Sequence, residues 1–131
     1  MVTRILHVED DADIREITQL ALALSGQFEL HQFTNGDEAL QQAAGIAPDL
    51  LLLDVMMPGM SGPELLVALR DVPGLAEVPA IFMTARVQKT EIAGFLEQGA
   101  IGVIAKPFDP VSLGQQIHDI LAAPATAAQP A

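Results

Sequence analysis

The sequence predicts an α/β fold, a doubly wound parallel sheet of five strands with helices on both faces. Strand-type and helix-type segments alternate five times along the chain, which is typical of parallel sheets connected through helices. The middle strand segment contains four consecutive leucines, Leu50–Leu53, as expected of a strand buried on both faces. Polar side chains then follow the strand segments at their carboxyl ends, where open α/β sheets place their chemistry.

The predicted strands are short β-type runs bounded by turn residues. Residues 28–33 alternate apolar and polar side chains, the pattern of a half-buried strand near an edge. In residues 80–83 every side chain is apolar, which indicates burial. The five strands are expected at residues 4–8, 28–33, 50–54, 79–84 and 101–105.

The predicted helices are identified by apolar residues at helical spacing. Asn35–Gly36 is interpreted as a turn before a short second helix, and Pro63 fits the first turn of the third. In the fourth helix Ile92, Phe95 and Leu96 are expected to face inward. The helices are expected at about residues 13–24, 39–43, 63–69, 90–98 and 113–121.

Composition limits the classes of protein to which the chain can belong. Its 131 residues fit one domain, and the absence of cysteine excludes disulfides and thiolate metal sites. No apolar run approaches the length of a membrane span, so we expect a soluble, cytoplasmic protein without membrane association. The net charge of −11 with only six basic residues argues against direct nucleic-acid binding.

Five polar residues follow strand segments and are expected to converge at one edge of the sheet. Clustered carboxylates repel one another, and Mg²⁺ relieves this because it prefers oxygen ligands. A lysine and a threonine hydroxyl beside such a metal could hold a phosphoryl group. The five residues are Glu9 and Asp10 after the first strand, Asp54, Thr84 and Lys106.

Each of these residues also has an ordinary structural interpretation. Glu9 and Asp10 could be acids at a helix N-terminus, and Asp54 could cap a turn. Thr84 could end a strand, and Lys106 could be a solvated lysine. Five such coincidences at matching strand ends are less probable than one site.

Four segments in order resemble the receiver domain of two-component response regulators, including the chemotaxis regulators. The resemblance covers residues 3–122 and implies a receiver domain over residues 1–122, with the flavodoxin-like strand order 2-1-3-4-5. The Ala/Pro-rich residues 123–131 are then expected to be a disordered tail or the start of a linker. The segments are Ile5-Leu6-His7-Val8-Glu9-Asp10-Asp11, Leu53-Asp54-Val55-Met56-Met57-Pro58-Gly59-Met60-Ser61-Gly62, Met83-Thr84-Ala85 and Ala105-Lys106-Pro107-Phe108.

The resemblance implies a signalling phosphoacceptor and not an enzyme. Asp54 would accept a phosphoryl group from a histidine kinase or a histidine phosphotransfer protein. Thr84 would donate a hydrogen bond to the phosphoryl group, and Lys106 would form an ion pair with it. The peptide bond between Lys106 and Pro107 would be cis.

The same resemblance implies a Mg²⁺ site. Asp10 and Asp54 would bind the ion, Glu9 would bind it largely through water, and the Met56 carbonyl would be a further ligand. The implied partners also include a downstream effector protein or a covalently linked output domain, and a phosphorylation-dependent homodimer. No output domain is expected to fit within the 131 residues.

Two positions affect how such a switch would work. Val103 stands where the family commonly carries an aromatic ring that swings inward, so signal output is expected to use a different surface or backbone shifts. Met56 and Arg86 occupy the positions that tune water attack on the phosphoryl group. Met56 has no strong hydrogen-bond donor, so we expect slow self-dephosphorylation. Met56, Met57, Met60 and Met83 are expected to pack around the site.

Two other functions are considered. Phosphohydrolases of the haloacid-dehalogenase type carry Asp-x-Asp after the first strand. The corresponding segment here, Asp54-Val55-Met56, lacks the second acid and belongs to the third predicted strand. The alternative is an unphosphorylated receiver-like docking module, for which the complete set of five polar residues has no chemical need. The three histidines are scattered over the predicted elements, so no histidine metal cluster is expected.

Overall fold

The computed structural model describes residues 2–123, which form one parallel sheet covered by helices on both faces. The strand order is β2-β1-β3-β4-β5, which confirms the predicted fold class. The strands are β1 (Thr3–Val8), β2 (Phe28–Phe33), β3 (Leu50–Asp54), β4 (Ala80–Thr84) and β5 (Gly102–Ala105). The predicted tail lies, from residue 124 on, outside the described residues.

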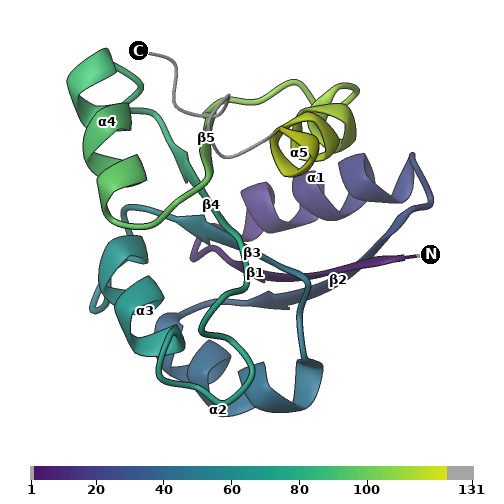
Figure 1. The fold of residues 1–131 in the computed structure, drawn as a ribbon. Helices are drawn as coiled ribbons and strands as arrows, with labels where there is room; N and C mark the ends of the chain where they lie inside the picture. The colour runs from purple at the N-terminus through teal and green to yellow at the C-terminus, as the bar shows by residue number, and fades with distance from the viewer. Residues whose placement is uncertain (1, 124–131) are drawn as a thin grey trace.

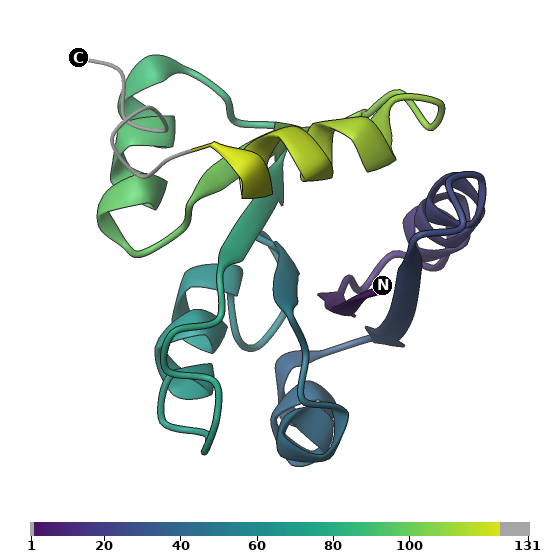
Figure 2. The same ribbon diagram turned by 45° about the vertical axis from the view of Figure 1, so that its right-hand side comes forward.

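The helices form two layers, with α1 and α5 on one face of the sheet and α2 and α3 on the other (Figures 1 and 2). None of them, within residues 2–123, is long and apolar enough to cross a bilayer. The helices are α1 (Ala12–Ala23), α2 (Gly36–Ile46), α3 (Gly62–Leu69), α4 (Lys89–Glu97) and α5 (Leu113–Ala122).

The chain bends at Thr34 and Asn35, as the predicted turn requires, but Gly36 already belongs to the helix. The Asn35 side chain accepts a hydrogen bond from the Glu38 amide at 2.9 Å and thereby caps α2. The helix therefore starts at Gly36, ahead of the apolar positions that predicted it. Sequence periodicity locates the buried face of a helix but not its first turn.

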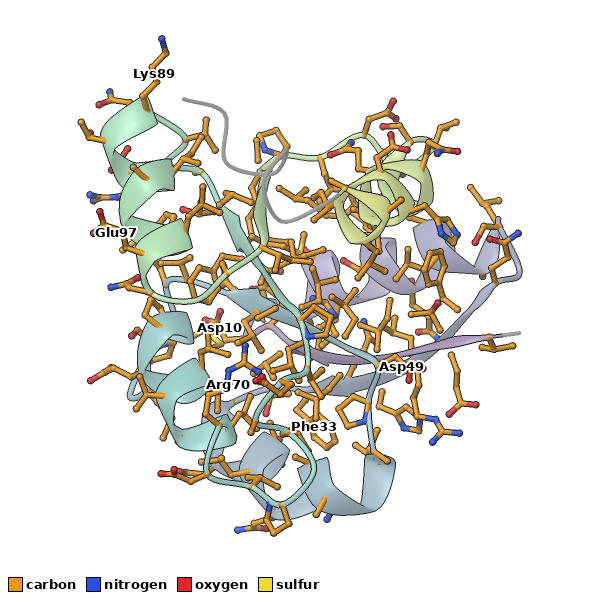
Figure 3. All side chains as sticks on the ribbon, in the orientation of Figure 1. Asp10, Phe33, Asp49, Arg70, Lys89 and Glu97 are labelled. Atoms are coloured by element: carbon orange, nitrogen blue, oxygen red, sulfur yellow. The ribbon has the colours of Figure 1, made fainter. Side chains whose placement is uncertain are left out.

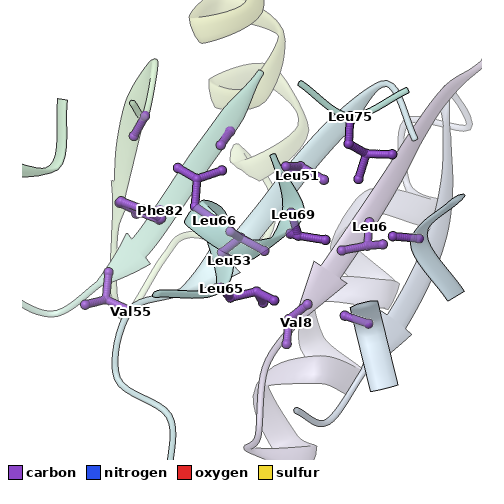
Figure 4. Packing of buried hydrophobic residues seen from close by; sticks show 14 residues of the cluster. Leu6, Val8, Leu51, Leu53, Val55, Leu65, Leu66, Leu69, Leu75 and Phe82 are labelled. Atoms are coloured by element: carbon purple, nitrogen blue, oxygen red, sulfur yellow. The ribbon is translucent and has the colours of Figure 1, made fainter. Parts of the chain in front are cut away.

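Two apolar layers enclose the sheet. Leu6, Leu51 and Leu53 face α2 and α3, where they pack with Leu65 and Leu69 (Figure 4). Alternate residues of the same strands face α1 and α5 on the other side, because successive side chains of a strand point to opposite faces. The Leu50–Leu53 strand is fully buried, as predicted.

Helix α4 is less buried than expected. Ile92, Phe95 and Leu96 are only half-buried, although Phe95 packs edge-on against Phe82 with ring centroids 5.4 Å apart. The prediction of which side of α4 faces inward is therefore correct, but the helix covers the sheet incompletely.

Gly62 sets the approach of α3 to the end of β3. Its amide donates to the Val55 carbonyl at 2.9 Å, and a Cβ at this position would collide with the Asp54 carbonyl oxygen. We expect Gly62→Ala to lower the free energy of unfolding by roughly 1–3 kcal/mol, measured by denaturant titration followed by circular dichroism. Gly94→Ala in α4 is the matched control, because nothing lies within 4 Å of its added methyl group. The control substitution should leave the free energy of unfolding unchanged or raise it. An equal loss of stability in both variants would contradict the packing argument.

Candidate functional site

The polar residues predicted to converge all lie at the carboxyl edge of the sheet. Glu9 directly follows β1, and its amide donates to the Phe33 carbonyl at 3.0 Å. Asp54 and Thr84 are the last residues of β3 and β4. Lys106 follows β5, and its amide donates to the Thr84 carbonyl at 2.9 Å. The strand pairings themselves therefore carry these residues to one edge.

Lys106 joins the carboxylates of two different strands. Its Nζ donates a hydrogen bond to Asp54 Oδ1 at 2.6 Å and lies 2.8 Å from Glu9 Oε1. The two carboxylates are buried, with 1% of Glu9 and 3% of Asp54 exposed. Lys106 is thus the positive charge that compensates two buried acids, and it is not a solvated lysine.

Burial dominates the electrostatics of the site. It raises the pKa of Glu9 to about 7, a rise that the Lys106 hydrogen bond opposes and the neighbouring Asp54 charge increases. Burial alone would lower the pKa of Lys106, but its bonds to Asp54 and Glu9 outweigh burial and raise that pKa. The lysine therefore stays charged, while Glu9 readily holds a proton.

Three carboxylates at this edge could hold a cation together. Glu9, Asp10 and Asp54 each offer one oxygen, and these oxygens all lie within 4.8 Å of one another. Asp10 is exposed whereas the other two are buried, so the cluster opens to solvent on the Asp10 side. Hard divalent cations such as Mg²⁺ prefer this kind of oxygen-only set.

Thr84 has a hydroxyl proton available for a ligand. Its side chain is buried, and its Oγ1 accepts a hydrogen bond from the Arg86 amide at 3.0 Å. Among residues 2–123, no hydrogen bond joins the Thr84 hydroxyl to the side chain of Asp54 or Lys106. The predicted cis bond between Lys106 and Pro107 is confirmed.

The methionines do not all pack around the site. Met83 is fully buried, but 64% of Met56 is exposed, so the packing prediction for Met56 is wrong. Met57 and Met60 are half-buried against the apolar layer that includes α3. Met56 lies in the loop after β3, where most of the residue is exposed to solvent.

Sequence reasoning missed two residues that hold the acidic loop. Asp11 caps α1, and its own amide donates to Glu9 Oε2 at 3.2 Å. Arg15 Nη1 donates to the Glu9 carbonyl at 2.8 Å. A cation near a helix N-terminus opposes the helix dipole, so the position of Arg15 was a signal that it has another role.

The three histidines lie on different elements of the described part of the chain. His7 is buried on β1, whereas His31 lies on β2, 2.7 Å from Glu29. His118 lies on α5 with its ring centroid 5.0 Å from that of Phe28.

The known proteins that this chain matches include response regulators. A family model described as the response regulator receiver domain matches residues 5–118. The transcriptional regulatory protein CseB of Streptomyces coelicolor is 40% identical over 119 residues, which cover 91% of this chain and 49% of CseB. The chain spans about half the length of the curated relatives it matches.

Solved structures agree. The chemotaxis response regulator CheY4 of Vibrio cholerae superposes with a TM-score of 0.83 at 26% identity, covering 92% of this chain and 99% of that one. A response regulator from Desulfuromonas acetoxidans gives a TM-score of 0.80 at 31% identity, covering 91% and 96%. Sequence, fold and acidic edge together place the chain in one family. It belongs to the response regulator receiver domain family.

Proposed function

We propose that the chain is a phosphoaccepting switch in which Asp54 takes a phosphoryl group from the phosphohistidine of a histidine kinase or a histidine phosphotransfer protein. The observation that carries this proposal is the buried Asp54 carboxylate, bonded to Lys106 beside two further acids. A buried acid held by a lysine at an opening is suited to accept an electrophile, whereas a docking surface needs neither group.

The three carboxylates fit a Mg²⁺ ion. Glu9, Asp10 and Asp54 would hold it, with the Met56 carbonyl as a further ligand, and their clustered negative charge would be neutralised in the process. When bound, Mg²⁺ supplies positive charge beside the transferring phosphoryl oxygens. Metal binding requires Glu9 to be ionised.

In the proposed transfer, a carboxylate oxygen of Asp54 attacks phosphorus. The new oxygen–phosphorus bond forms as the nitrogen–phosphorus bond of the donor breaks, and the leaving imidazole takes a proton from solvent. Lys106 Nζ moves from sharing the carboxylates to pairing with a phosphoryl oxygen, and Thr84 donates its hydroxyl proton to another. The chain does no further chemistry beyond slow loss of the phosphoryl group to water.

The added charge at Asp54 would alter protein contacts. Val103 is half-buried on β5, so the aromatic movement common in the family has no equivalent at this position. The proposed output is contact with an effector protein or a linked output domain, and phosphorylation-dependent pairing of two copies belongs to the same proposal. We place this function in the cytoplasm, which suits a chain without cysteine.

Labelling with acetyl phosphate tests the proposal without a kinase. Intact mass after incubation with acetyl phosphate and Mg²⁺ should show one phosphoryl adduct, and EDTA should prevent it. No adduct, combined with no Mg²⁺ binding by calorimetry, would favour an unphosphorylated docking module.

Mg²⁺ affinity is expected to depend on pH through Glu9. Because the pKa of Glu9 is about 7, protons compete with the metal below that value, and affinity rises with pH until Glu9 is ionised. Lowering the pH from about 8 to about 6 should weaken binding about tenfold in calorimetric titrations. Glu9→Gln should remove this dependence, and an unchanged pH profile in that variant would assign it to another group.

The phosphoryl lifetime is expected to be long because Met56 has no hydrogen-bond donor to orient water. Met56→Asn introduces an amide at this exposed position and should shorten the half-life of the adduct severalfold, followed by the decay of its mass signal. Val67→Asn, an exposed substitution on α3, serves as the control. A wild-type half-life of seconds would contradict the argument.

A further inference from the structure

Arg15 connects the acidic loop to the rest of the molecule. Its Nη1 donates to the Glu9 carbonyl at 2.8 Å, and the side chain is half-buried. The contact crosses from α1 back to the residue between β1 and the exposed Asp10. It constrains the backbone that carries both acids.

Gln32 on the edge strand β2 bonds the backbone of Arg15. Its Nε2 lies 2.7 Å from the Arg15 carbonyl and 3.1 Å from His7 Nδ1. A carbonyl can only accept, so the amide nitrogen must be oriented toward it, and its second hydrogen is then directed to the histidine. Both hydrogens of the amide are thereby used.

His7 is the last residue in this series of contacts. Because Nδ1 accepts from Gln32, the ring is neutral and its proton resides on Nε2, which has no partner among residues 2–123. The ring is fully buried, and burial together with the charges of Lys106 and Arg15 lowers the pKa of His7 to about 3. The acceptor at Nδ1 therefore persists throughout the physiological range of pH.

We propose that Arg15, whose backbone carbonyl is held by the Gln32–His7 pair, is a positioning residue that sets Glu9 and Asp10 for the divalent cation. This inference rests on the Mg²⁺ site of the proposed function. It assigns a metal-affinity role to residues that touch neither the metal nor the phosphoryl group. The contacts run through β1, α1 and β2, the three elements around the acidic loop.

The charge of Arg15 and its positioning contact are expected to change Mg²⁺ affinity in opposite directions, which makes the inference testable. As a charge alone, Arg15 repels a cation, so its loss would strengthen Mg²⁺ binding. As a positioning group, its loss weakens binding. Arg15→Lys keeps the charge on a side chain one bond shorter, which withdraws the donor from the Glu9 carbonyl, and Gln32→Leu removes both amide contacts without changing any charge.

The experiment is calorimetric titration of each variant with Mg²⁺, because the chain has no Tyr or Trp to report binding. We expect Arg15→Lys to weaken Mg²⁺ binding about tenfold and Gln32→Leu to weaken it in the same direction. The loss of Mg²⁺ affinity in the double variant should be smaller than the product of the two single fold-changes, because both substitutions interrupt the same series of contacts. In acetyl phosphate labelling, the half-saturating Mg²⁺ concentration should rise while the rate at saturating Mg²⁺ is retained.

Arg70→Lys is the matched control. Arg70 is likewise half-buried and donates to two backbone carbonyls, those of Leu75 and Val78, which precede β4 and lie toward the opposite edge of the sheet. It should lower thermal stability without changing Mg²⁺ affinity. Wild-type affinity in Arg15→Lys and Gln32→Leu would overturn the inference, as would an equal loss in Arg70→Lys. If the wild-type chain itself bound no Mg²⁺, the metal site of the proposed function would fail as well, and the wild-type titration alone identifies that case.

Discussion

Asp54→Asn is expected to abolish the phosphoryl adduct completely. The amide has nearly the shape of the carboxylate, and its oxygen can still accept from Lys106, so the fold should persist. An amide oxygen, however, is a far weaker nucleophile and forms no stable acyl phosphate. Intact mass after acetyl phosphate treatment should therefore equal that of the untreated variant at every Mg²⁺ concentration.

Asp49→Asn is the control for this loss. Asp49 accepts from the Arg4 amide at 2.8 Å and lies well away from Asp10 (Figure 3). This variant should be labelled like the wild type. An adduct that survived in Asp54→Asn would place the acceptor on another residue.

Lys106→Met is expected to give the largest loss of stability. The change leaves two buried carboxylates without their shared cation, and removing one partner of a buried ion pair costs about 3 kcal/mol. The loss should be greater at pH 8 than at pH 5, because Glu9 already holds a proton at the lower pH. Lys106 itself stays charged throughout this range, so the pH dependence arises from Glu9.

Denaturant titrations at the two pH values, followed by circular dichroism, measure this difference. Added Mg²⁺ should restore part of the stability at pH 8 because it replaces the missing charge. Lys89→Met provides the control, since Lys89 is exposed and extends into solvent from the start of α4 (Figure 3). The same loss at both pH values would show that the charge of Glu9 does not contribute to the role of Lys106.

The fold and the convergence of the site could be predicted because both follow from strand topology. A continuous apolar run that ends in a turn, such as Leu50–Leu53, indicates a strand buried on both faces, and five alternations of strand and helix favour parallel pairing. Once the strands are parallel, Asp54, Thr84 and Lys106 must meet at one edge. The strand order, by contrast, was implied by the resemblance to receiver domains and did not follow from local spacing.

Contacts that depend on side-chain direction could not be predicted. The depth of burial decides whether Lys106 reaches Glu9 as well as Asp54. It also raises the pKa of Glu9. The contact from Arg15 to the Glu9 carbonyl spans a loop, so no regular spacing of residues in the sequence indicates it. Met56 was assigned to packing by residue type, although the loop after β3 carries it out of the core.

Chemical trapping of the acyl phosphate tests the central claim most directly. Borohydride reduces an aspartyl phosphate to homoserine, which peptide mass mapping locates within the sequence. After treatment with acetyl phosphate and Mg²⁺, homoserine is expected at position 54 and at no other aspartate. Homoserine at Asp10 or Asp11, or none at position 54 in protein that carries the phosphoryl adduct, would contradict the assignment of Asp54 as the phosphoacceptor.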